Sequence, residues 1–190
     1  MKAEAFFRVL AWTVLVVPCV AACSRAEDAR KGKEKAMAIK LTSSAFAEGQ
    51  TIPVKHTGQG QDVSPALKWT GAPVTARSFA LICDDPDAPG KVWVHWVLWN
   101  IPADASELTE KVAKLEELPN GIRQGNNDFP GIGYNGPMPP PGKPHRYYFK
   151  LYALDAKLDL KPGAAKPQLL DAMKGHIVAE GQLMGAYKRR

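Results

Sequence analysis

The sequence has little cysteine and no apolar run long enough to cross a bilayer. Only three of its 190 residues are Cys, so the fold must rest on a hydrophobic core and not on disulfide bonds. The N-terminal apolar run, residues 9–22, is shorter than the roughly 20 residues that a membrane-spanning helix needs. With 45% hydrophobic and 23% charged residues, the composition excludes a polytopic membrane protein and a wholly disordered chain.

The N-terminus resembles a bacterial export signal. Lys2 and Arg8 precede the apolar run, and small residues follow it, which is the order of a secretory signal. The run ends in Val20-Ala-Ala-Cys23, which resembles the lipobox, in which the Cys becomes the lipidated first residue of the mature protein. We predict a lipoprotein signal peptide over residues 1–22 and lipidation of Cys23. The alternative is an ordinary signal cleaved nearby, with Cys23 incidental.

Behind the signal we predict a tether over residues 23–37 and a folded domain over residues 38–190. The tether is charged and has too few large apolar side chains to fold alone, whereas the domain is long enough to bury a core. Cys19 would leave with the signal and Cys23 would carry lipid. Only Cys83 would remain, so no intramolecular disulfide is expected.

The formal net charge of +6 suggests an anionic partner such as nucleic acid, but little of the excess lies in the domain. Residues 1–40 hold eight Lys or Arg and four Asp or Glu, which is +4. The remaining residues hold 17 against 15, and three of the 17 are Lys188, Arg189 and Arg190. The distribution favours placement beside a membrane surface and predicts no nucleic-acid partner.

Aromatic and branched residues predict strands over 79–83, 92–101 and 147–154. Weaker strands are predicted over 39–41, 51–54, 67–69 and 181–187. A helix is predicted over 167–179 and a second helical piece near 110–115. Because the strands do not alternate regularly with helices, we predict a mainly β domain with an antiparallel sheet and few helices.

Two histidines and a group of carboxylates are the candidate chemical groups. Asp84-Asp-Pro-Asp-Ala-Pro89 follows a strand, and its prolines hold three carboxylates close together. His95 lies within the next, otherwise apolar strand, where an unpartnered imidazole is costly to bury. Residues 121–145, of which twelve are Gly or Pro, lead to His145 at the start of a third strand. We expect these groups to meet at one sheet end, with the Gly/Pro segment as an ordered wall of the site.

Three chemistries remain open for this group. A metal site would use His and carboxylate ligands, but no familiar ligand spacing supports it. A nucleophilic hydrolase would need Ser64 or Ser78 beside a His, and nothing in the sequence places one there. An anion pocket needs only His side chains and loop N–H groups that face a phosphate or acetate, so we predict no metal and no cofactor. His56, in a polar turn, is expected to be solvated.

Together these residues resemble the phosphatidylethanolamine-binding protein family, in its bacterial, Raf-kinase-inhibitor-like branch. Asp85–Pro89 followed by Val94-His-Trp96 resembles the family's first signature, and Gly133–Pro137 with Pro144–Tyr147 resembles the second. The resemblance implies a large central antiparallel sheet, a smaller sheet and a few peripheral helices. It also implies a small anion pocket at one sheet end, lined by Asp85, Asp87, Pro89, Trp93, His95, Gly136, Pro137, His145 and Tyr147. His95 and His145 would donate to the anion, and Asp85 would hold a His or a ligand ammonium.

These observations predict a non-enzymatic binding protein, anchored through lipidated Cys23 on the periplasmic face of a bacterial envelope. In a Gram-negative cell the outer membrane is favoured, because Ser24 follows the Cys. The expected ligand is phosphate, acetate or a phosphoryl head group. The alternative is a weak hydrolase that uses His95 with Asp85, and a third class is an inhibitor or regulator of a protein partner.

Overall fold

The computed structural model describes residues 37–129 and 131–189. The predicted signal peptide, Cys23 and nearly all of the predicted tether lie outside these residues. Within the described ranges, no helix is both long and apolar enough to cross a bilayer.

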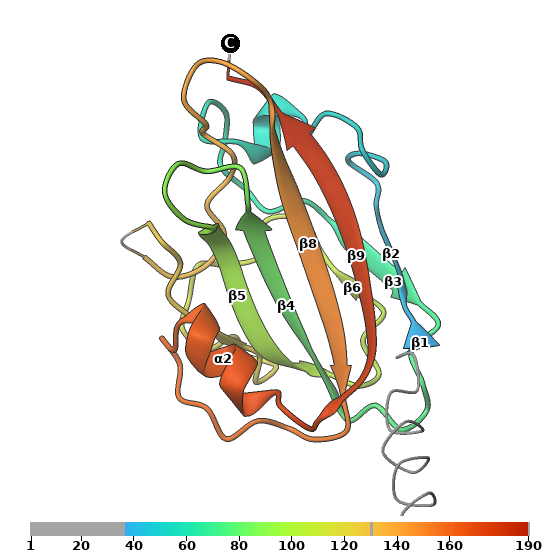
Figure 1. Cartoon of the computed structure of the whole chain (residues 1–190). Helices are drawn as coiled ribbons and strands as arrows, with labels where there is room; N and C mark the ends of the chain where they lie inside the picture. Colours follow the sequence, from blue (N-terminus) through green and yellow to red (C-terminus); the bar gives the residue numbers. More distant parts are fainter. Residues whose placement is uncertain (1–36, 130, 190) are drawn as a thin grey trace, which may run out of the picture. The chain divides into compact units, whose positions relative to one another are not determined.

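The larger of two sheets has six strands, in the order β1-β9-β8-β4-β5-β7 (Figure 1). All neighbours are antiparallel except β1, which runs parallel to β9. The strands are β1 (Met37–Ala38), β4 (Ser78–Asp85), β5 (Trp93–Pro102), β7 (Arg123–Gln124), β8 (His145–Leu154) and β9 (Ile177–Tyr187). The predicted mainly β fold with a central antiparallel sheet is therefore confirmed.

The smaller sheet covers one face of the larger one. It consists of β2 (Lys40–Ser43), β3 (Leu67–Thr70) and β6 (Glu107–Leu108), in the order β2-β3-β6. Between the sheets lies the main core, to which β3 contributes Leu67 and Trp69, and the large sheet contributes Phe79, Leu81 and Phe149. Apolar surface from both sheets is thus removed from water, which is the main stabilising contribution to the fold.

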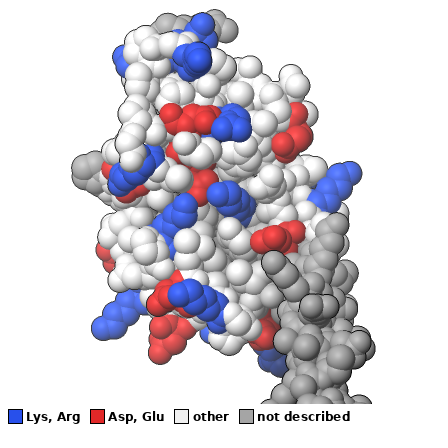
Figure 2. All heavy atoms as spheres, viewed as in Figure 1, with Lys and Arg blue, Asp and Glu red and all other residues white. Residues whose placement is uncertain are grey.

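The opposite face of the larger sheet packs against a short helix, α2 (Lys166–Ala172) (Figure 1). Leu169 of α2 and Met173 just after it join Ile82 and Val97 in a second core. Every residue of β4 is buried, because this strand lies between neighbours on both sides and has a core on each face. Figure 2 shows the α2 side of the sheet, where cationic and anionic side chains are interspersed.

The helix is shorter than predicted, and the last strand is longer. The sequence predicted a helix over 167–179, but α2 ends at Ala172 and β9 begins at Ile177. Gly175 has a φ of +80°, a left-handed conformation that ends a helix and that glycine adopts at little cost. Residues after this turn pair with β8. The hydrogen bonds of the sheet and the burial of Ala179 stabilise a strand here more than the helical spacing of the apolar residues stabilises a helix.

Two weaker predictions were wrong. Residues 110–115 form no helix, because the backbone N–H groups of Lys111 and Val112 donate to the carbonyl and hydroxyl of Ser64 instead. Residues 51–54 form no strand beyond a single bridge between Thr51 and Ala186. The chain then turns into a 3-10 helix, η1 (Val54–His56).

Candidate functional site

A cavity of about 200 Å³ opens where the end of β4 meets the starts of β5 and β8. The antiparallel pairing of β4 with both neighbours brings these three strand ends together (Figure 1). The lining residues are Asp85, Ala88, Pro89, Trp93, His95, Phe129, Met138, Pro139, Pro140, His145 and Tyr147. The cavity therefore unites both candidate histidines, the carboxylate turn and the Gly/Pro segment.

Three predicted site residues lie beside the cavity and do not line it. Asp87 faces away and pairs with Arg146. Gly136 packs against the backbone of His56, and the carbonyl of Pro137 accepts a hydrogen bond from the N–H of Gly58. These two residues position the Gly/Pro segment, whereas its neighbours Phe129, Met138, Pro139 and Pro140 form the wall. The composition of the segment indicated a wall but not which of its side chains would form it.

A β-bulge directs His95 into the cavity. On β4, Cys83 pairs with Trp96 and the next residue, Asp84, pairs with Val94, so the register skips His95. Val94 belongs to the core under α2, and Trp96 belongs to the core between the sheets. The extra residue places His95 on the same side of the sheet as Trp96 and at the cavity. Bulges next to functional sites often redirect a side chain in this way.

The His95 ring is buried, with 2% of the residue exposed. Its Nδ1 lies 2.6 Å from the carbonyl oxygen of Asn135, and because a carbonyl only accepts, Nδ1 carries the hydrogen. The other ring nitrogen, Nε2, is buried without a hydrogen-bond partner. Phe129 and Tyr147 meet the ring edge to face, with centroids 5.2 Å and 5.1 Å away. Burial lowers the pKa of His95, so the neutral ring is favoured.

His145 is held by a buried carboxylate. Its Nδ1 donates to Oδ2 of Asp85 at 2.8 Å, while Oδ1 of Asp85 accepts the N–H of Asp87 at 2.8 Å. Asp85 is 3% exposed, so both oxygens are satisfied away from water. Burial and then the charge of Asp85 raise the pKa of Tyr147, which keeps its phenol protonated. The carboxylate thus fixes the orientation of His145 and leaves its other nitrogen for the cavity.

Asp62 is a positioning residue that sequence reasoning missed. Its Oδ1 accepts the N–H of Gly136 at 2.6 Å, and its Oδ2 accepts from the Asn135 side chain at 3.2 Å and from Lys114 at 2.9 Å. Because the Asn135 carbonyl holds His95, Asp62 fixes that imidazole through one intervening residue. Its φ of +55°, which is uncommon for a non-glycine residue, belongs to a folded loop that no local sequence pattern indicates.

His56 is buried, contrary to the expectation that it is solvated. It is 2% exposed, and its Nδ1 lies 2.9 Å from the carbonyl oxygen of Val63. Its own carbonyl accepts the hydroxyl of Tyr134 at 2.8 Å. The polar residues around His56 in the sequence suggested exposure, but the 121–145 segment folds over this turn and covers it.

The ion pair between Asp87 and Arg146 predicts a pH-dependent contribution to stability. Hydrogen bonds from Arg146 lower the pKa of Asp87 from its ordinary value of 3.8 to about 2. A lowered pKa stabilises the folded state above the unfolded value, and this contribution is lost as pH falls through the folded value. We expect Asp87→Asn to lower the thermal unfolding midpoint slightly at pH 7, because the exposed Arg146 is screened by water. The difference from wild type should disappear near pH 2, and a difference that persists there would contradict the assignment. Asp104→Asn, at an exposed position, is the control.

The geometry separates the three chemistries that the sequence left open. Among the described residues, no group of three His, Cys, Asp or Glu side chains is placed to hold a metal ion. Ser64 and Ser78 lie outside the cavity, where Ser64 accepts from Val112 and Ser78 donates to the carbonyl of Ala156. Asp85 pairs with His145 and not with His95, so the dyad differs from the one considered for a hydrolase. An anion pocket needs no further residue.

Three surface hollows are larger than this cavity, two of about 550 Å³ and one of about 360 Å³. The first is lined by residues 51–54, 144 and 186–189, the second by residues of the 101–122 region, and the third by residues 61–64 and 111–114. None of their described lining residues is a histidine. We therefore place the candidate site in the smaller cavity, where two buried or half-buried imidazoles and a buried carboxylate converge.

Comparison with known proteins assigns the family. The family model described as phosphatidylethanolamine-binding protein matches residues 42–188, which include every cavity residue. This chain belongs to the phosphatidylethanolamine-binding protein family. Family membership supports a role as a binding protein, as the sequence resemblance implied.

Relatives of this family match about four fifths of this chain. A UPF0098 protein of Methanothermobacter thermautotrophicus is 52% identical over 151 residues, which cover 80% of this chain and 99% of the relative. A UPF0098 protein of Aquifex aeolicus is 43% identical over 153 residues, which cover 80% of this chain and 89% of the relative.

Two solved structures share the fold. A phosphatidylethanolamine-binding protein homologue from Chlamydia trachomatis is 41% identical, with a TM-score of 0.73, and covers 80% of this chain and 99% of its own. YbcL of Escherichia coli, described as a member of the mammalian family, is 33% identical, with a TM-score of 0.74 and the same coverage. The chain thus shares its fold with family members from Chlamydia trachomatis and Escherichia coli.

Proposed function

We propose that this protein binds a small phosphate-type anion in the β4–β5–β8 cavity without chemically changing it. Inorganic phosphate, acetate and phosphoryl head groups have the size and charge for this role. The observation that carries the proposal is the convergence of His95 and His145 on one cavity, each held from behind through Nδ1. Each ring thereby has its Nε2 left for a ligand, and the protonated form of either ring is a donor to an anion.

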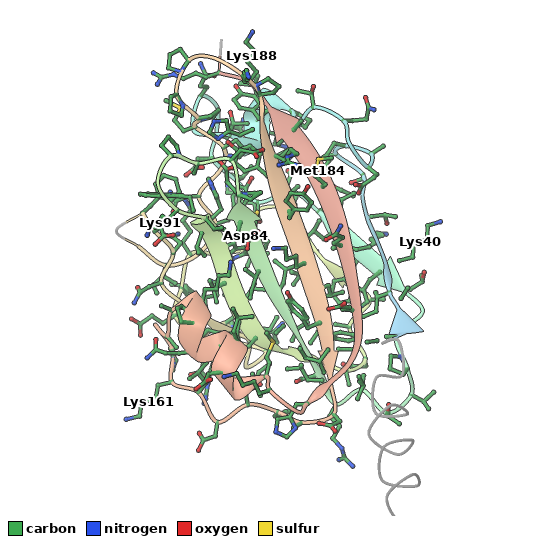
Figure 3. The ribbon with its side chains drawn as sticks, in the orientation of Figure 1. Lys40, Asp84, Lys91, Lys161, Met184 and Lys188 are labelled. Atoms are coloured by element: carbon green, nitrogen blue, oxygen red, sulfur yellow. The ribbon has the colours of Figure 1, made fainter. Side chains whose placement is uncertain are left out.

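The electrostatics of the cavity favour a single compact anion. Asp85 is the only acidic residue in the described lining of the cavity, and it accepts hydrogen bonds from His145 and from the N–H of Asp87, which offset its charge. Lys91, 5.0 Å from the Trp93 ring centroid, pairs with Asp128 at 2.7 Å, so these two charges offset each other beside the cavity (Figure 3). A volume of about 200 Å³ is below the usual range for drug-sized ligands, so the pocket fits a head group better than a lipid chain.

Titration with phosphate should perturb two of the four histidines. In NMR spectra of the full-length protein, we expect millimolar phosphate or phosphoethanolamine to shift the imidazole resonances of His95 and His145. His56, buried behind the segment, and His176, paired with Asp155 at the surface, are internal controls that should not move. His176→Gln assigns its own resonance without touching the cavity. If neither cavity imidazole moved at millimolar ligand, the proposal would be wrong.

The hydrolase alternative rests on the Asp85–His145 dyad, which has the arrangement of an oriented general base. No Ser, Thr or Cys belongs to the described lining of the cavity, so water would have to be the nucleophile. Turnover of a generic phosphoester that disappears in His145→Gln would replace the binding proposal with this one.

We further propose that Cys23 anchors the domain in a bacterial envelope. The support is the Val20-Ala-Ala-Cys23 sequence and the charged residues that follow it; multiple acyl chains on one Cys would anchor the protein stably where a single chain does not. Cys23→Ser should move nearly all of the protein from the membrane fraction to the soluble periplasmic fraction, measured by immunoblot. Cys19→Ser, four residues earlier, is the matched control and should leave the protein in the membrane. Membrane retention of Cys23→Ser would contradict lipidation.

A further inference from the structure

The unpartnered Nε2 of His95 defines which anions the cavity takes. Because Nδ1 donates to the Asn135 carbonyl, the neutral ring has a lone pair and no hydrogen on Nε2. A fully deprotonated oxyanion brings only lone pairs to this position. A ligand that carries an O–H group instead completes the one missing hydrogen bond, and a buried acceptor left without a donor is costly.

Burial, and not the charged groups that face His95, favours this neutral form. Asp85 faces it from β4 and Tyr147 from β8; Asp128 and Asn135 approach from the 121–145 segment, and Asp62 from the chain before β3. The three carboxylates favour the charged ring, but burial outweighs them, so the pKa of His95 is lowered. His145 has a different partner, because its Nδ1 donates directly to the Asp85 carboxylate.

The neutral His95 ring therefore presents an acceptor, and no hydrogen, to the cavity. We propose that the cavity selects oxyanions that carry their own proton, such as a phosphomonoester monoanion, over permanently ionised oxyanions such as sulfate esters and phosphodiesters. This inference rests on the proposed anion-binding function and narrows its ligand class. The P–O–H of the ligand donates to Nε2 of His95, and His145 lines the same cavity.

An intact diester phospholipid head group carries no such proton at neutral pH. Free phosphate does, and a phosphomonoester does in its monoanion, which predominates below its second pKa of about 6 and is a minority form at pH 7. Free phosphate and the phosphomonoester monoanion thus share a phosphate group that carries a proton. The cavity therefore suits a monoester and not a diester.

Methyl phosphate and methyl sulfate test this directly, because at pH 5 methyl phosphate is mainly a monoanion with the shape and charge of methyl sulfate and one additional O–H. By calorimetry on the full-length protein, we expect methyl phosphate to bind roughly tenfold tighter or more. Dimethyl phosphate, the diester, should bind as weakly as methyl sulfate. Between pH 5 and pH 8 the preference should disappear, because methyl phosphate loses its proton and methyl sulfate has none to lose.

Two variants assign the preference to His95. In His95→Gln, the side-chain amide can turn its N–H₂ toward the ligand, so methyl sulfate should bind as well as methyl phosphate. His145→Gln is the matched control, which should weaken both ligands and preserve their ratio. If neither ligand bound to wild type, the proposed anion-binding function itself would fail. If both bound equally to wild type, the pocket would stand and only the selection for a proton-bearing ligand would be overturned, whether or not His95→Gln folds.

Discussion

Replacing Gly136 by Ala should destabilise the protein by about 3 kcal/mol or more and abolish phosphate binding. A Cβ at this position would lie 2.3 Å from the carbonyl oxygen of His56 and 2.7 Å from the Cα of Thr57. Both obstacles are backbone atoms, so no side-chain rotation relieves the overlap. The Gly136 N–H is also tied to Asp62, which prevents the segment from moving away without losing that bond.

The expected loss of phosphate binding follows from the contacts of Asn135, the residue before Gly136. Asn135 accepts the Nδ1–H of His95 through its carbonyl and donates its own N–H to the His95 carbonyl. A displaced Gly136 moves Asn135, and His95 then loses the contact that sets its tautomer. We expect the His95 resonance of the variant no longer to respond to phosphate.

Urea unfolding with Gly131→Ala as the control measures the effect. Gly131 lies in the same segment, but an added Cβ there meets no atom within 4 Å, so its midpoint should remain close to that of wild type. A wild-type midpoint for Gly136→Ala would contradict the close packing of the segment on the His56 turn.

The central strands could be predicted because their environment imposes a simple pattern. β4 and β5 have a core on each face, and a strand buried on both faces is apolar almost throughout. The carboxylate turn and His95 interrupt this apolar pattern, so both could be recognised in the sequence as candidate site residues. The family signatures then assigned a common pocket to residues that are far apart in the chain.

The geometry inside the pocket could not be predicted in the same way. Whether His95 faces the cavity depends on a bulge of one residue, and a bulge has no clear signature in a sequence without alternation. The role of Asp62 depends on hydrogen bonds to residues more than 70 positions later. The same holds for His56, whose burial is produced by a segment that arrives from elsewhere in the chain.

Neighbouring carboxylates on β4 have different partners on opposite faces of the sheet. Asp85 turns to the cavity and His145, whereas Asp84 turns to the α2 side (Figure 3). Asp84 is 1% exposed, and it binds Nζ of Lys150 at 2.8 Å and also Nζ of Lys166 at the start of α2. The alternation of a strand thus gives one carboxylate a site role and the next a structural one.

Asp84→Ala should therefore lower the free energy of unfolding by about 2–3 kcal/mol with little change in phosphate affinity. Removing the carboxylate leaves two lysine ammonium groups close together; their side chains are 32% and 20% exposed, so water offsets part of the cost. Urea unfolding and phosphate titration together measure the two effects.

Asp171→Ala is the control, since it removes a carboxylate from an exposed pair with Lys174 and should leave the unfolding midpoint unchanged.

Replacing both Lys150 and Lys166 by Met in the Asp84→Ala background should recover much of the lost stability, because an apolar cluster replaces a buried charged one without leaving an uncompensated charge. If the triple variant were less stable than Asp84→Ala alone, the lysines would be stabilising the fold through packing or other contacts and not through Asp84. If Asp84→Ala instead lost phosphate binding while remaining stable, Asp84 would belong to the site, and the division of the two carboxylates between the faces of β4 would be wrong.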